Sequence, residues 1–80
     1  LDTFKCLRFA YEAAEAGGSY PVVLNAANEV LVQQFLEGRI KFLDIQNTIE
    51  KVLQGHKPEY QLDLEGILEI DQTVRRELEL

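Results

Sequence analysis

Three interruptions rich in glycine and proline divide this chain into four segments, and they limit its possible folds more than any other feature. They are Gly17-Gly18, Gly38, and Gly55 followed by Pro58. Within each segment, apolar residues recur at steps of three and four, the period of a helix rather than the alternation of a strand. Because the joins are short, we expect an all-α fold, a compact four-helix bundle-like domain.

The first predicted helix runs from about residue 3 to 16. Thr3 or Asp2 can act as its N-cap, and Gly17-Gly18 ends it because glycine tolerates the left-handed backbone of a helix C-terminus. We expect its apolar stripe to contain Phe4, Leu7, Ala10 or Tyr11, and Ala14.

The second predicted helix runs from Ser19 or Tyr20 to Glu37, and it is apolar on most sides. Ser19 can cap it, and Pro21 is tolerated in a first turn. A helix of this kind usually lies at the centre of a bundle. Its expected stripe consists of Val23, Ala26 or Ala27, Val30, Leu31, Gln34 and Phe35.

The last two helices are predicted from about Leu43 to Gln54 and from just after Asp63 onward. Asp44 in the first turn of one, and Asp63 as N-cap of the other, suit the positive end of a helix dipole. The third helix presents Ile45, Ile49, Val52 and Leu53 on one face. The fourth has its period in Leu64, Ile67, Leu68, Asp71, Val74 and Leu78.

Charge and composition exclude several classes of partner. The net charge is −6, and the eight Lys and Arg residues are scattered, so neither a nucleic-acid backbone nor an anionic membrane is an expected partner. No apolar run approaches the ~20 residues that span a bilayer. The sequence starts at Leu1 and contains no Met. We therefore expect residues 1–80 to be one domain of a longer protein.

Isolated residues that could carry chemistry are better explained structurally. His56 lies in a Gly-His-Lys-Pro turn, where an exposed surface histidine is expected. Cys6 has no histidine at a suggestive spacing and is expected to be a buried structural cysteine. With one His, one Cys and dispersed acids, no metal site is predicted. Gly17-Gly18-Ser19 lacks the pattern of a phosphate-binding loop, so capping is the expected role of Ser19.

The most unusual run is Leu24-Asn25-Ala26-Ala27-Asn28-Glu29, which places three polar residues in an apolar helix. Asn25 shares a helix face with Asn28 and with Glu29. Asparagine is a mediocre helix former, so two of them inside a helix indicate specific hydrogen bonds. We expect a structural polar cluster, a buried network that fixes packing or a loop. Binding of a substrate or metal is the alternative.

The same run carries a family resemblance that extends over essentially the whole chain. The chain resembles the C-terminal region of the 1-deoxy-D-xylulose 5-phosphate reductoisomerase family. Two departures, Leu31 and Tyr20, stand where the family commonly has smaller residues. The matching stretches are Leu7–Ala13, Ala16-Gly17-Gly18, Leu24–Val30, Phe35-Leu36, Ile40–Ile45, Ile49–Leu53 and Asp63–Asp71 with Arg75.

This resemblance implies a parent enzyme that rearranges and reduces 1-deoxy-D-xylulose 5-phosphate to 2-C-methyl-D-erythritol 4-phosphate for non-mevalonate isoprenoid biosynthesis. It implies NADPH and Mg²⁺ or Mn²⁺ as cofactors, a homodimeric parent, and a cytoplasmic location in bacteria or a plastid location in plants. The family's cofactor, metal and substrate ligands belong to earlier domains. No catalytic, cofactor or metal residue is therefore expected here, and the domain is expected to brace the catalytic domain of its own parent chain.

A helical adaptor that binds foreign proteins is the alternative function, and it would need an exposed apolar patch. Under the first hypothesis, an isolated domain exposes the face that it uses against the catalytic domain. We expect weak self-association through that face.

Overall fold

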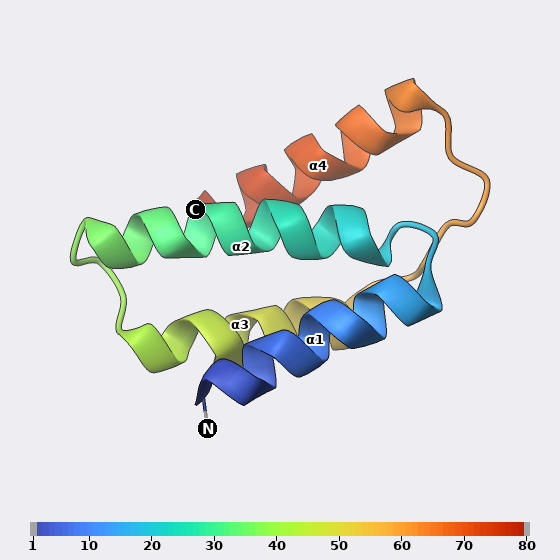
Figure 1. Ribbon diagram of the computed structural model, residues 1–80. Helices are drawn as coiled ribbons and strands as arrows, with labels where there is room; N and C mark the ends of the chain where they lie inside the picture. The colour runs from blue at the N-terminus through green and yellow to red at the C-terminus, as the bar shows by residue number, and fades with distance from the viewer. Residues whose placement is uncertain (1, 80) are drawn as a thin grey trace.

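A computed structural model describes the backbone of residues 2–79 and the side chains of residues 7–79. Within this part of the chain the structure consists of helices and contains no strand, which confirms the all-α prediction (Figure 1). The proposed cap at Thr3 or Asp2 and the roles predicted for Phe4 and Cys6 lie outside the described side chains. The helices are α1 (Asp2–Ala16), α2 (Tyr20–Leu36), α3 (Phe42–Gly55) and α4 (Leu64–Glu79).

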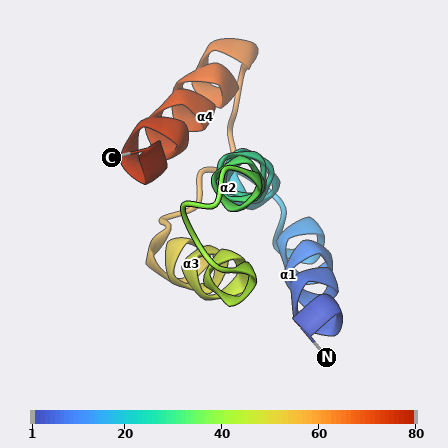
Figure 2. The same cartoon turned by 90° about the vertical axis from the view of Figure 1, so that its left-hand side faces the viewer.

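Helix α2 lies at the centre of the molecule, as its composition predicts. It packs against α1, α3 and α4, whereas α4 packs against α2 alone. The view along α2 shows the other three helices arranged around it, with α4 on the side away from α1 (Figure 2). The outward side of α2, between α1 and α4, carries the exposed residues Asn25, Asn28 and Val32. Three sides of the central helix are therefore covered and the fourth is open.

The hydrophobic core follows α2 and uses small side chains for close packing. Ala26 and Ala27 are fully buried, and the α2 stripe is confirmed except for Phe35, which is 37% exposed. Burial of such apolar surface is the main favourable contribution to folding. The buried cluster consists of Phe9, Val23, Ala26, Ala27, Leu31, Ile45, Ile49 and Val74.

The face that α1 buries differs from the predicted one. Phe9 and Ala13 are buried, whereas Leu7 and Tyr11 are exposed, as are Ala10 and Ala14. Phe9 and Ala13 are four residues apart and therefore lie on one helix face. This pair combines one large side chain with one small one, and it was overlooked because alanines recur on both sides of α1.

The ends of the helices mostly follow the predicted signals. Gly17, Gly18 and Gly38 have positive φ, as expected after helix C-termini. The N–H of Gly66 donates to Asp63 Oδ1 over 2.7 Å, which confirms the N-cap of α4. The N–H of Lys41 donates to Asp44 Oδ2 over 2.8 Å at the start of α3. None of the described helices has the length and apolar composition needed to cross a membrane.

Helix α4 buries less of its predicted stripe than α3 does. Ile45 and Ile49 of α3 are buried, but Val74 is the one α4 residue in the core. Leu64 and Leu68 were expected on the core face, yet they are 71% and 54% exposed. Because α4 has one neighbouring helix, only the narrow stripe of its apolar residues that faces α2 is buried.

Candidate functional site

Ser19, at the junction between α1 and α2, holds a distant loop in place. Its side chain is fully buried. Its Oγ lies 2.6 Å from His56 Nε2 and accepts the N–H of Glu59 over 2.8 Å. It makes no side-chain capping bond to α2, so the capping role predicted for Ser19 is wrong. The hydroxyl group instead bonds to His56 and Glu59 in the loop after α3.

His56 is half-buried in this contact, so its predicted surface exposure is also wrong. Its imidazole ring meets the ring of Tyr20 edge-on, with centroids 5.3 Å apart. Gly18 completes the contact, since a Cβ there would lie 2.6 Å from the carbonyl oxygen of Glu59. We call Gly18, Ser19, His56 and Glu59 the loop clamp.

The serine–histidine pair in the loop clamp has the composition of a nucleophile and its base, but its environment is structural. A nucleophilic hydroxyl must reach a substrate, and Ser19 is fully buried. Its oxygen is also bound to a backbone amide. This pair therefore fixes the path of the chain between α3 and α4.

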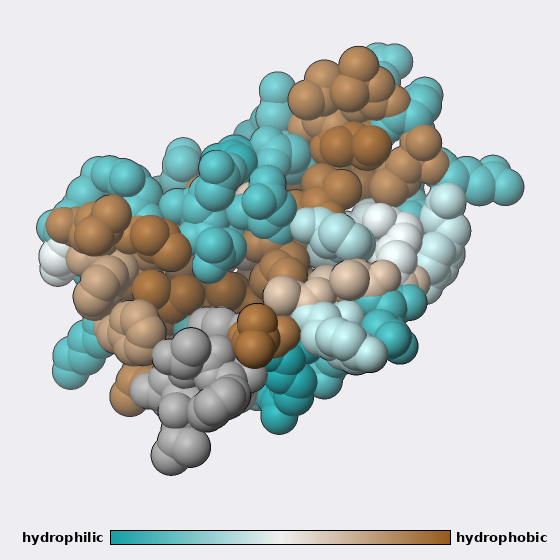
Figure 3. Space-filling model, in the orientation of Figure 1, coloured by the Kyte–Doolittle hydropathy of each residue, from teal (hydrophilic) through white to brown (hydrophobic). Residues whose placement is uncertain are grey.

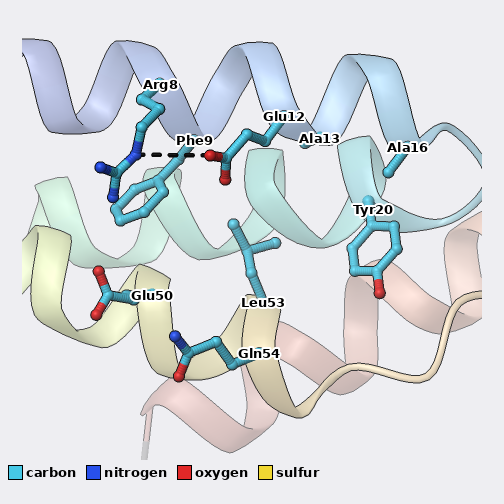
Figure 4. Close-up of a pocket in the computed structure, with 9 residues that line it drawn as sticks. All are labelled: Arg8, Phe9, Glu12, Ala13, Ala16, Tyr20, Glu50, Leu53 and Gln54. Carbon is cyan, nitrogen blue, oxygen red and sulfur yellow. Dashed lines mark ion pairs between the residues drawn. The ribbon is translucent and has the colours of Figure 1, made fainter.

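A cavity of about 300 Å³ lies between α1 and α3 (Figure 4). Phe9 and Ala13 from α1 and Leu53 from α3 supply its apolar lining. Arg8 and Glu12 pair with each other along α1, with Nε and Oε1 3.6 Å apart. Such an exposed pair contributes little to stability. Among the described residues, the lining offers apolar contact and a charged rim, and it contains no serine, cysteine or histidine.

Asn25, Asn28 and Glu29 lie on one side of α2, but they are exposed rather than buried. The burial predicted for them is therefore wrong within this domain, because no helix covers the open side of α2. Glu29 forms an ion pair with Arg75 of α4. The structural role predicted for the two asparagines stays a prediction.

Arg75 of α4 contacts two carboxylates, Glu29 of α2 and Asp71 of its own helix. Its Nε donates to Asp71 Oδ2 over 2.8 Å, and its other contact is to Glu29. The hydrogen bond to Asp71, and next the one to Glu29, raise the pKa of Arg75 above its ordinary value. The guanidinium therefore stays charged, and its charge is matched locally. No group of three or more His, Cys, Asp or Glu suited to a metal ion occurs among the described residues.

The fold and these contacts define a small all-α domain in which the buried and paired polar groups hold helices and loops together. Residues 1–77 match the family described as the DXP reductoisomerase C-terminal domain, and the chain belongs to that family. DXP is 1-deoxy-D-xylulose 5-phosphate, so the family resemblance found in the sequence is confirmed.

Relatives among curated proteins carry the name of the whole enzyme. The 1-deoxy-D-xylulose 5-phosphate reductoisomerase of Bacillus cereus (strain ATCC 10987 / NRS 248) is 55% identical over 75 residues, which cover 94% of this chain and 20% of the relative. The enzyme of Macrococcus caseolyticus (strain JCSC5402) is 54% identical over 71 residues, covering 89% and 19%. No solved structure matches the chain. The chain thus spans about a fifth of the length of these relatives.

Proposed function

We propose that this chain is the non-catalytic helical domain of an NADPH-dependent 1-deoxy-D-xylulose 5-phosphate reductoisomerase. In this proposal the parent enzyme isomerises and reduces its substrate to 2-C-methyl-D-erythritol 4-phosphate. It is a homodimer, located in the cytoplasm of a bacterium or in a plastid. The domain contributes by bracing the catalytic domain of the same chain. A precise active site depends on such support for the residues that contact the substrate.

The family match over residues 1–77 is the observation that carries this proposal. The polar groups of the domain also support it. Ser19 and His56 hold a loop, and Arg75 pairs with Glu29 and Asp71, so these groups already have structural partners. The exposed apolar side chains of α4, Leu64 and Leu68, offer surface for a neighbouring domain.

NADPH and Mg²⁺ or Mn²⁺ are assigned to the part of the parent enzyme outside this chain. Divalent cations of this kind need converging oxygen ligands, and the described residues present no such group. A dinucleotide needs a glycine-rich turn after a strand, whereas Gly17-Gly18 joins two helices. We therefore derive no catalytic step from residues of this domain.

Enzyme assay of the purified chain tests the proposal directly. The chain is incubated with NADPH, 1-deoxy-D-xylulose 5-phosphate and Mg²⁺ or Mn²⁺, and NADPH oxidation is followed by its absorbance. We expect no turnover above the rate without protein, while the full-length enzyme turns over under the same conditions. Turnover by the chain, free of full-length enzyme, would overturn the assignment.

The adaptor alternative is tested by the reading frame that precedes Leu1. A dinucleotide-binding domain encoded there supports the enzyme, whereas a start codon immediately before Leu1 supports a free-standing adaptor. The exposed Leu64 and Leu68 would serve either function, so the genomic context separates the two.

A further inference from the structure

The Glu29–Arg75 ion pair links the open side of α2 to the side of α4 that carries Leu64 and Leu68, and we call these two sides together the open face. On α2, its residues follow one another at steps of three or four and are all exposed. Such steps keep the side chains on one helix face. The open face consists of Asn25, Asn28, Val32 and Leu36 from α2, and Leu64 and Leu68 from α4.

Helix packing leaves this face uncovered inside the domain. Both α1 and α4 contact α2, but they do not contact each other. The Glu29–Arg75 ion pair holds α4 alongside the open face. The space-filling view shows hydrophilic surface over the middle of α2, with hydrophobic surface over the end of α2 and over α4 (Figure 3). The face therefore has a polar centre between apolar patches, an arrangement suited to docking.

The polar centre has the chemistry to bind a peptide backbone. A carboxamide both donates and accepts hydrogen bonds, which matches the N–H and C=O groups of a polypeptide. Neither Asn25 nor Asn28 has a hydrogen-bonding partner among the described residues. Asparagine lowers helix stability relative to alanine, so two of them with no partner within the domain are costly to α2. A partner outside the domain gives them a role.

We propose that the open face docks on the part of the parent enzyme that precedes this domain, with Asn25 and Asn28 binding exposed backbone groups and the leucines filling apolar contacts. This inference rests on the proposed function. The relatives supply the partner, because about four-fifths of their length lies outside the matched region. Arg75 is already paired with Asp71 and Glu29, so it offers no free positive charge that would select an acidic partner.

Hydroxyl-radical footprinting of the full-length enzyme tests which face is covered. Side-chain oxidation is compared between the full-length enzyme and the isolated chain. We expect Leu36, Leu64 and Leu68 to react at least about threefold more slowly in the full-length enzyme, because docking removes them from water. Leu43, which is 51% exposed at the start of α3, serves as the internal control and should react equally in both.

The outcomes of this experiment separate the two proposals. Protection of Leu43 and Phe42 instead of the leucines of the open face overturns the inference, and leaves the bracing function standing. Equal oxidation of all these side chains also overturns the inference. The isolated chain is therefore footprinted well below the concentration at which it self-associates. Protection that appears only when the isolated chain self-associates, and not in the full-length enzyme, assigns the open face to a second copy of the chain and overturns the inference.

Asparagine-to-aspartate substitutions in the full-length enzyme test the backbone contacts. Asn25→Asp and Asn28→Asp remove an amide donor and add a charge at exposed helix positions, so folding should continue. We expect each to speed proteolytic cleavage at the domain junction by roughly tenfold, the factor that corresponds to losing one buried polar contact. Asn47→Asp is the matched control, because Asn47 is exposed on α3 away from the open face.

A cleavage rate for Asn25→Asp and Asn28→Asp equal to that of Asn47→Asp would overturn the role of the asparagines. Circular dichroism of the isolated variants checks that α2 is intact. If a variant loses helix, Asn25→Gln and Asn28→Gln replace it, since they keep the amide and shift it by one methylene. The inference then expects intermediate cleavage rates, and rates equal to wild type overturn it.

Discussion

Gly18 lies where a side chain has no room, next to the fully buried Ser19. Its φ is +58°, and a Cβ would approach the carbonyl oxygen of Glu59 to 2.6 Å. Gly38 has a similar backbone, φ +77°, but open space around it. The two glycines therefore separate the cost of a left-handed backbone from the cost of a steric clash.

We expect Gly18→Ala to lower the free energy of unfolding by about 2–4 kcal/mol, the sum of backbone strain and overpacking against the loop. Gly38→Ala should lower it by about 1 kcal/mol, from backbone strain alone. Urea unfolding followed by circular dichroism measures both. Equal losses for the two variants would show that the loop around Glu59 shifts away from the added Cβ at no cost in stability.

Ser19→Ala tests the hydroxyl of the loop clamp. The substitution leaves the N–H of Glu59 and the imidazole of His56 without their shared partner. We expect a loss of about 1–3 kcal/mol in the free energy of unfolding. Thr73→Ala is the control, because its hydroxyl bonds only to the carbonyl of Glu69 on an exposed helix surface, and it should change stability by less than about 0.5 kcal/mol. A loss for Ser19→Ala no larger than that of Thr73→Ala would contradict a structural role for the clamp.

At the level of single residues, local sequence signals predicted where helices are capped better than they predicted which partners the side chains bind. Asp63 caps α4 as predicted, because capping depends on residues within one turn. Ser19 carries the same local signal, yet its hydroxyl bonds to His56, 37 positions away in the sequence. Periodicity and capping rules contain no information on such long-range contacts.

Among the elements, α4 has the fewest neighbouring helices within the described part of the chain. It packs against α2 alone and contributes only Val74 to the buried core. The Glu29–Arg75 ion pair is partly exposed and adds little to that contact. Local unfolding begins where few apolar contacts hold an element, so α4 should open before α2 and α3.

Amide hydrogen exchange of the isolated chain measures this order. We expect α4 amides to exchange faster than those of α2 under native conditions. Val74→Ala should speed exchange in α4 selectively, since it deletes about 1–3 kcal/mol of buried contact at one helix. Ile49→Ala, in a core shared by several helices, should cost about 2–5 kcal/mol and speed exchange throughout. A uniform effect of Val74→Ala would mean that α4 unfolds only with the whole domain.

Helix ends could be predicted because glycine and proline end helices through local backbone geometry. Helix faces were harder to predict. In α1, the stripes containing Leu7 or Phe9 both fit a helical period, and only packing against α2 selects Phe9 and Ala13. In α4, the predicted stripe was wider than the contact, so Leu64 and Leu68 remained exposed.

For the whole molecule, the central position of α2 followed from its apolar composition, but the open face did not. Burial of Asn25 and Asn28 was predicted because two asparagines inside an apolar helix indicate specific hydrogen bonds. The structure places one helix on each of three sides and leaves those residues exposed. The relative placement of helices depends on long-range packing, which a periodic pattern does not encode.

Self-association of the isolated chain is the prediction that belongs to this scale. The open face combines Leu64 and Leu68, 71% and 54% exposed, with the exposed end of α2. An exposed apolar patch tends to pair with another copy. We expect concentration-dependent, weak association in sedimentation equilibrium, with a Kd on the order of 0.1–1 mM, because small contacts support only low affinity.

The contact responsible for self-association is identified by two charge-introducing variants. Leu68→Asp places a carboxylate on the open face and should make the chain monomeric at all concentrations, because burying an unpaired charge is unfavourable. Leu43→Asp introduces the same charge at the start of α3, where the side chain is similarly exposed, and should leave association unchanged. If Leu43→Asp abolishes association and Leu68→Asp does not, then the apolar end around α3 forms the contact. Under the proposed function, a domain removed from its parent exposes the surface that it used there, so we expect the leucine that controls association to lie on the side that docks on the rest of the enzyme.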